Sequence, residues 1–112
     1  MQFITLETEQ QLQDITASEN PQAILKHNTT CPISNGVLDR LQNDTGEVIN
    51  IETIHVLDLL ANRQLSNTIA SQFGVPHQSP QILVIQNGRC IYHEWGFDIT
   101  AQAMDGALQS QA

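Results

Sequence analysis

The sequence predicts an α/β fold in which helices flank a mixed central sheet. Short apolar runs rich in β-branched residues alternate with segments whose apolar residues recur at helical spacing, which is typical of parallel strands joined by crossover helices. Asn87-Gly88 between two strand-like runs indicates a tight hairpin, which adds antiparallel strands. The length of 112 residues suits one domain over residues 1–112. The expected order of elements is β-α-β-α-β-α-β-β-α.

The first half of the chain is expected to hold three strands and two helices. Thr8 and Gln11 match a capping pair at the start of the first helix, and Asn20-Pro21 ends that helix. The expected elements are a strand at 3–6, a helix at 8–18, a strand at 22–26, a helix from Pro32 to about residue 43, a loop at Asp44-Thr45-Gly46 and a strand at 53–57.

The second half is expected to add a helix, the hairpin and a final helix. Leu65, Ile69 and Phe73 share one face of a helix over 61–73, and Gly74 is placed to end it. The remaining elements are strands at 81–85 and 89–94 and a helix that Thr100 or Asp98 caps and that reaches about residue 108. With a cysteine after the second strand and a Ser-Pro pair before the hairpin, this order is that of a thioredoxin-like fold.

Charge and cysteine content narrow the class of protein. The chain has 12 acidic residues against 4 basic ones and a net charge of −8, which argues against nucleic acid or an anionic membrane as a partner. No apolar run approaches the roughly 20 residues of a membrane span, and the first residues do not resemble a signal peptide. Two cysteines without such a signal fit free thiols in a reducing compartment, so we expect a cytoplasmic protein.

Cys31 lies at the expected junction between the second strand and the second helix. Pro32 suits the first helical position, which places Cys31 at or beside the N-cap. Free backbone N–H groups and the positive end of the helix dipole favour the thiolate there, and the thiolate is the nucleophilic form. The sequence therefore predicts a reactive thiol, with a small buried hydrophobic residue as the alternative.

The spacing from Cys31 to Ser34 resembles the Cys-x-x-Cys of thioredoxins and glutaredoxins with serine in place of the second cysteine. Ser34 cannot resolve a mixed disulfide by attacking it, so an outside thiol has to do so. Its hydroxyl, one helical turn after Cys31, could donate a hydrogen bond to the thiolate.

Ser79-Pro80 directly precedes an apolar strand, where proline is unusual. In thioredoxin-like folds the equivalent proline is cis and packs beside the active cysteine, and the residue before it offers its backbone to the incoming disulfide. We expect a cis bond here and trans bonds at Asn20-Pro21 and Val75-Pro76, with a trans proline at a loop entry as the alternative.

Two further segments have two interpretations each. Backbone N–H groups between Trp95 and Asp98 could hold a carboxylate of a small thiol, flanked by Trp95 or Phe97. Alternatively, Asp98 or Thr100 could cap the last helix while the aromatic side chains pack in the core. Lys26 and His27 could stabilise the thiolate or bind an acidic substrate, or form a solvated strand end.

We expect Cys90 to be a packing residue. No metal site is expected, because no metal-ligand spacing relates His55, His77 and His93 to one another or to the cysteines.

The segment from Lys26 to Ser34, with Thr-Cys-Pro-Ile-Ser at its end, is similar to the active site of the monothiol bacilliredoxin family. Residues 75–81, followed by an apolar strand and Asn87-Gly88, form a second match. Trp95 and the Asp-Ile-Thr at 98–100 form a third. The resemblance covers nearly the whole chain.

This resemblance implies a cytoplasmic role in low-molecular-weight thiol chemistry. Bacillithiol would be the thiol co-substrate, with no bound cofactor, and the partners would be bacillithiolated proteins and another redoxin or reductase. Cys31 and Ser34 would be catalytic, and the substrate-binding residues would be Thr30, Pro32, Ser79, Pro80, Lys26, Trp95 and Asp98. Two alternatives are iron–sulfur cluster binding or delivery, as in monothiol glutaredoxins, and a redox-inert adaptor. The Pro-Ile after Cys31 counts against the first, because those glutaredoxins carry Gly-Phe there.

Overall fold

A computed structural model describes residues 1–44 and 50–110, and Thr45 and Gly46 of the expected loop lie outside these ranges. The predicted order of strands and helices is confirmed, with one short 3₁₀ helix added. The elements are β1 (Gln2–Thr5), α1 (Glu9–Ala17), β2 (Gln22–His27), α2 (Pro32–Asn43), β3 (Thr53–Asp58), α3 (Arg63–Phe73), β4 (Gln81–Gln86), β5 (Arg89–Trp95), η1 (Gly96–Asp98) and α4 (Ala101–Gln109).

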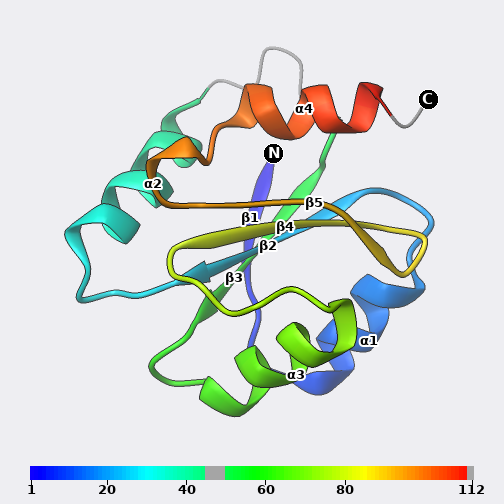
Figure 1. The fold of residues 1–112 in the computed structure, drawn as a ribbon, viewed down its shortest axis with the longest axis horizontal. Coiled ribbons are helices and arrows are strands. Elements are labelled where there is room, and N and C mark those ends of the chain that lie inside the picture. Colours follow the sequence, from blue (N-terminus) through cyan, green and yellow to red (C-terminus); the bar gives the residue numbers. More distant parts are fainter. Residues whose placement is uncertain (45–49, 111–112) are drawn as a thin grey trace.

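The sheet has the strand order β1-β3-β2-β4-β5. β3 pairs in parallel with β1 and β2, and β4 runs antiparallel to β2 and β5 (Figure 1). Asn87 and Gly88 have φ values of 53° and 76°, which is the left-handed backbone that a type I′ hairpin turn requires at both central residues. The mixed sheet predicted from the sequence is therefore present.

Helices cover both faces of the sheet. Figure 1 shows α1 and α3 on one side and α2 and α4 on the other. Within β2, Ile24 belongs to the core under α1 and α3, whereas Ala23 and Leu25 belong to the core under α2 and α4. Because successive strand residues point to opposite faces, Lys26 and His27 at the end of β2 also point to opposite sides of the sheet.

Local capping follows the sequence signals. Thr8 and Gln11 form a reciprocal capping box at the start of α1. Gly74 ends α3 with a φ of +68°, where a residue with a side chain would be strained. Thr100 caps α4 by accepting a hydrogen bond from the Ala103 N–H at 3.1 Å.

Candidate functional site

Three segments meet at one end of the sheet, and each contains residues that the sequence singled out. Gln81, at the start of β4, pairs with Lys26 of β2 on one side and with Trp95 of β5 on the other. The connection from β2 to α2, the loop before β4 and the end of β5 therefore lie at the same end, as Figure 1 shows. This end contains Cys31, Pro80 and Trp95.

Cys31 is the N-cap of α2, and Pro32 is the first residue of the helix. The Cys31 N–H donates to the Asn28 carbonyl at 3.1 Å, and the Cys31 carbonyl accepts from the Asn35 N–H at 3.0 Å. The thiol is free and half-buried, and its side chain makes no capping hydrogen bond. A thiolate at this position faces the positive end of α2, which is the environment of a nucleophilic cysteine.

Ser34 is fully buried beneath the first turn of α2. Its Oγ accepts a hydrogen bond from the Asn28 N–H at 2.9 Å and lies 2.7 Å from His27 Nδ1. The sequence suggested a hydrogen bond from this hydroxyl to the thiolate, but the hydrogen bonds that the structure shows are with His27 and Asn28. Ser34 thus fastens the helix start that carries Cys31 to the end of β2.

Asn28 organises the turn between β2 and Cys31. Its Oδ1 accepts hydrogen bonds from the Thr30 N–H at 2.9 Å and the Thr30 Oγ1 at 2.7 Å. The N–H and the hydroxyl of Thr30 are therefore both hydrogen-bonded within the turn. Sequence reasoning did not single out Asn28, although an Asn two residues before a Thr is a recognisable Asx-turn pattern.

His27 lies on the same face of the sheet as α2. Burial lowers the pKa of its imidazole below the ordinary value of 6.5, and the nearby Asp58 carboxylate opposes this shift. Asp58 is the residue paired with His27 in the neighbouring strand β3. A neutral imidazole is therefore the form that hydrogen-bonds with Ser34 at neutral pH.

Lys26 lies on the opposite face and is fully buried. Its Nζ donates to the Ser66 carbonyl of α3 at 3.1 Å and to His77 Nδ1 at 3.3 Å. Burial lowers the pKa of this ammonium from 10.5 to about 8. A solvated strand end, one of the two interpretations from the sequence, is therefore wrong for Lys26, and its buried ammonium is not placed to touch an acidic substrate at the surface.

The loop before β4 ends at Ser79-Pro80. Their peptide bond is cis, and the described residues contain no other cis bond, so Asn20-Pro21 and Val75-Pro76 are trans. Pro80 is buried, and its carbonyl accepts a hydrogen bond from the Gly96 N–H at 3.0 Å. This bond joins the loop to the segment that follows Trp95.

Trp95 and Phe97 are largely exposed, with 54% and 62% of their surfaces accessible. Arg40 of α2 donates to the Phe97 carbonyl at 2.7 Å and also to the Ile99 carbonyl, which ties α2 to the connection between β5 and α4. Asp98 is exposed within η1. Thr100, and not Asp98, provides the helix cap, so the capping interpretation is correct for Thr100. The expectation of core aromatic residues in this segment is wrong, because both rings are exposed.

Most of the chain, including the segments described above, matches a protein-family model. The model of the family described as "Monothiol bacilliredoxin BrxC" matches residues 4–104. The chain belongs to the monothiol bacilliredoxin family. Cys31, Ser34, Pro80 and Trp95 all lie within the matched range.

Solved structures show the same fold for this bacilliredoxin. A protein described as having a thioredoxin fold is 27% identical, with a TM-score of 0.82 over 95% of this chain and 93% of that one. A thioredoxin from Trypanosoma brucei brucei is 11% identical, with a TM-score of 0.76 over 97% and 89% of the two chains. Thioredoxin f from spinach chloroplast is 12% identical, with a TM-score of 0.73 over 95% and 93%. Family and fold together make the chain a thiol redox protein of thioredoxin-like architecture.

The second cysteine of the bacilliredoxin differs from the first. Cys90 is half-buried, and its Sγ donates to the Tyr92 carbonyl at 3.2 Å. Burial raises the pKa of this thiol above its ordinary value of 9.0. Cys90 pairs with Ile85 near the hairpin turn, whereas Trp95 lies at the other end of β5, roughly 17 Å away at the usual strand rise. Cys90 therefore packs against the core under α1 and α3, remote from the end of the sheet that carries Cys31.

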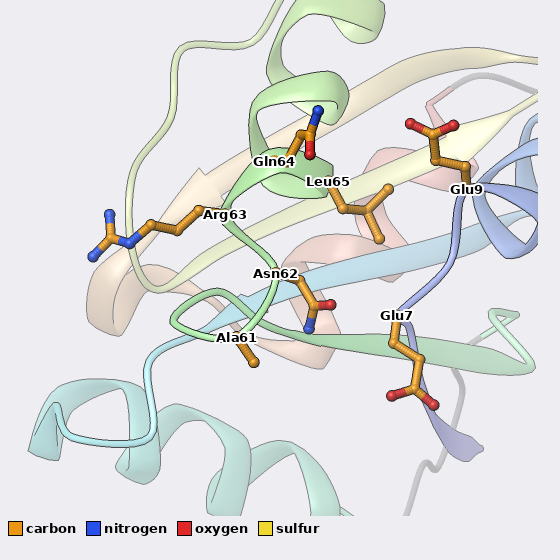
Figure 2. A pocket seen from close by; sticks show the side chains of 7 residues that line it. All are labelled: Glu7, Glu9, Ala61, Asn62, Arg63, Gln64 and Leu65. Carbon is orange, nitrogen blue, oxygen red and sulfur yellow. The ribbon is translucent and has the colours of Figure 1, made fainter.

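An open pocket of about 370 Å³ lies elsewhere in the bacilliredoxin, between the β1–α1 and β3–α3 connections (Figure 2). None of its lining residues belongs to the segments around Cys31. They are Glu7, Glu9, Ala61, Asn62, Arg63, Gln64 and Leu65.

The described residues contain no group of His, Cys, Asp or Glu suited to a metal ion, and no described helix has the length and apolar character to span a membrane.

Proposed function

We propose that this protein removes bacillithiol from protein mixed disulfides by monothiol exchange at Cys31. The observation that carries the proposal is a free, accessible cysteine at the N-cap of α2, followed one turn later by a buried serine that is held by His27 and Asn28. The cysteine can form a mixed disulfide, and the serine cannot resolve it.

The exchange conserves electrons at each step. The Cys31 thiolate attacks the bacillithiol sulfur of a protein–S–S–bacillithiol disulfide. A disulfide forms between Cys31 and bacillithiol while the original disulfide breaks, and the substrate protein leaves as a thiolate that takes a proton from water. A second thiol, from bacillithiol or another redoxin or reductase, then attacks the new disulfide and returns Cys31 as a thiolate.

The surroundings of Cys31 supply a binding surface for this substrate. In this proposal Ser79 offers its backbone at one side, next to the buried Pro80, and the exposed ring of Trp95 flanks the other. Thr30, Pro32 and Asp98 complete the proposed contacts. During exchange, negative charge lies on the attacking Cys31 sulfur and on the sulfur of the leaving substrate protein. The positive end of α2 stabilises this charge. We place this reaction in the cytoplasm, where low-molecular-weight thiols are abundant.

The test uses a target protein that carries one bacillithiol on its only cysteine. We expect wild type and Cys90→Ser to restore the target thiol in the presence of free bacillithiol, and Cys31→Ala to restore no more than free bacillithiol does alone. Equal activity of Cys31→Ala and wild type would contradict the proposal. A coloured, iron-containing dimer without exchange activity would instead favour cluster binding.

A further inference from the structure

Lys26 is the only lysine of the chain, and its side chain is fully buried. The two partners that its Nζ contacts, the Ser66 carbonyl and His77 Nδ1, carry no negative charge. An ammonium buried without a carboxylate costs free energy, which a well-packed apolar side chain would avoid. The presence of a buried ammonium in spite of this cost indicates that its charge has a specific function.

The contacts of Lys26 lead to the loop that ends at Pro80. His77 belongs to that loop, and its Nδ1 also lies 3.4 Å from Ser66 Oγ. Gln81, which pairs with Lys26 across the sheet and is also fully buried, donates from Nε2 to the Pro76 carbonyl at 3.0 Å. Two adjacent buried side chains thus fasten the loop at Pro76 and His77.

We propose that Lys26 is a positioning residue for exchange: through His77 it holds the loop of residues 76–80, and this sets where Ser79 and Pro80 lie beside Cys31. The proposal rests on the proposed exchange only for its kinetic readout. Lys26 acts from the α3 side of the sheet, so it does not need to touch the thiolate or the substrate.

The charges around His77 keep this contact formed at neutral pH. Partial burial of the imidazole, Lys26 and Arg63 all lower the pKa of His77 below its ordinary value, so the imidazole stays neutral and its Nδ1 can accept. The groups that face it are Lys26 from β2 and Ser66 and Arg63 from α3. Protonation in acid removes the acceptor and places two cations together, which releases the loop.

The competing explanation is that the Lys26 charge acts directly on the Cys31 thiolate. Two probes separate these roles. Alkylation by the small reagent iodoacetamide requires only the Cys31 thiolate. Exchange with a protein mixed disulfide also requires the binding surface formed by Ser79 and Pro80. A positioning residue affects the second reaction and spares the first.

The experiment compares Lys26→Met, His77→Ala, their double variant and the control Gln78→Ala, which changes an exposed side chain of the same loop. We expect both single variants to raise KM for a bacillithiolated protein roughly tenfold, which corresponds to about 1.4 kcal/mol. We expect the double variant to match the single ones, because both changes break one contact. Alkylation of Cys31 should stay within about twofold of wild type, since its helix start is unchanged.

Two results would overturn the proposal. One is a parallel loss of alkylation and exchange in Lys26→Met with normal kinetics in His77→Ala. The other is additive effects in the double variant. Because His77 is exposed, His77→Ala remains informative if Lys26→Met does not fold.

A second readout does not depend on exchange activity. We expect the backbone order parameters of residues 77–79, measured by nitrogen-15 relaxation, to be lower in Lys26→Met than in wild type. If wild type shows no exchange with bacillithiolated protein, the proposed function fails while this measurement still tests the loop contact. Unchanged order parameters at these residues would refute the positioning role.

Discussion

The Ser34 hydroxyl lies 2.7 Å from His27 Nδ1 and accepts a hydrogen bond from the Asn28 N–H at 2.9 Å. The residue that occupies the position of a second cysteine is therefore a structural anchor as well as a chemically silent group. It fastens α2 to β2 directly beneath Cys31. Serine at position 34, where dithiol redoxins have a second cysteine, cannot act as a resolving thiol. Its hydrogen bonds instead help to hold the segment that carries Cys31 in place.

Replacing Ser34 by alanine should therefore destabilise the protein. The change leaves His27 Nδ1 and the Asn28 N–H without their buried partner, which costs about 1–3 kcal/mol in the free energy of unfolding. Chemical denaturation measures this loss. Ser71→Ala, at an exposed serine of α3, is the matched control and should change stability by less than about 0.5 kcal/mol. Equal effects of the two substitutions would show that the Ser34 contacts contribute nothing.

Replacing Ser34 by cysteine should change the product of the reaction. The variant acquires a thiol three residues after Cys31 at a helix start, which is the spacing of dithiol redoxins. We expect the mixed disulfide on Cys31 to be replaced by an internal disulfide and free bacillithiol. Non-reducing peptide mapping distinguishes the two products. Persistence of the mixed disulfide at wild-type levels would argue that residue 34 cannot reach Cys31.

Lys26 should impose a pH dependence on stability in alkaline solution. Its pKa is lowered from 10.5 to about 8, so between these values the unfolded chain binds a proton that the native chain lacks. The free energy of unfolding should consequently rise with pH across this window, by as much as about 3 kcal/mol at 1.36 kcal/mol per pKa unit.

The difference between wild type and Lys26→Met isolates this contribution from Tyr92 and Cys90, whose pKa values burial raises. Isotope labelling of lysine also gives a single signal, because Lys26 is the only one. Its titration midpoint should lie near 8. A midpoint at 10.5, together with identical pH profiles for the two proteins, would show that the ammonium is not desolvated.

Local signals in the sequence were sufficient for the fold and for the position of Cys31 at the start of α2. Pro32 after Cys31 predicts the helix start, and Gly74 and the pair Thr8 and Gln11 predict helix ends, because each rule involves residues within one turn. The order of the elements along the chain and the mixed character of the sheet followed from alternation and the hairpin signal, whereas the strand order within the sheet was not predicted.

Contacts between distant segments could not be predicted in this way. Lys26 meets Ser66 and His77, which lie 40 and 51 residues further along the chain, so its burial depends on how α3 packs on the sheet. Arg40 meets the Phe97 carbonyl 57 residues away for the same reason. Alternation along β2 places Lys26 and His27 on opposite faces, but only the packed helices show which groups they meet.

Exchange with bacillithiol should become faster as salt is added. The protein carries a net charge of −8, and the malate of bacillithiol is also negative, so the two repel at long range. Raising the ionic strength from about 0.01 M to 0.15 M shortens the screening length from about 30 Å to about 8 Å and reduces this repulsion. We expect the second-order rate constant to rise with salt, while a neutral thiol such as 2-mercaptoethanol serves as the control. A fall in rate for bacillithiol alone would point to a local cationic binding site.

The most direct measurement is the mass of the protein after a single turnover with a stoichiometric bacillithiolated target and no other thiol. We expect one bacillithiol on the peptide that contains Cys31, none on the peptide that contains Cys90, and an equal amount of target released as free thiol. A target that keeps its bacillithiol, or a label that appears on Cys90, would contradict monothiol exchange at Cys31.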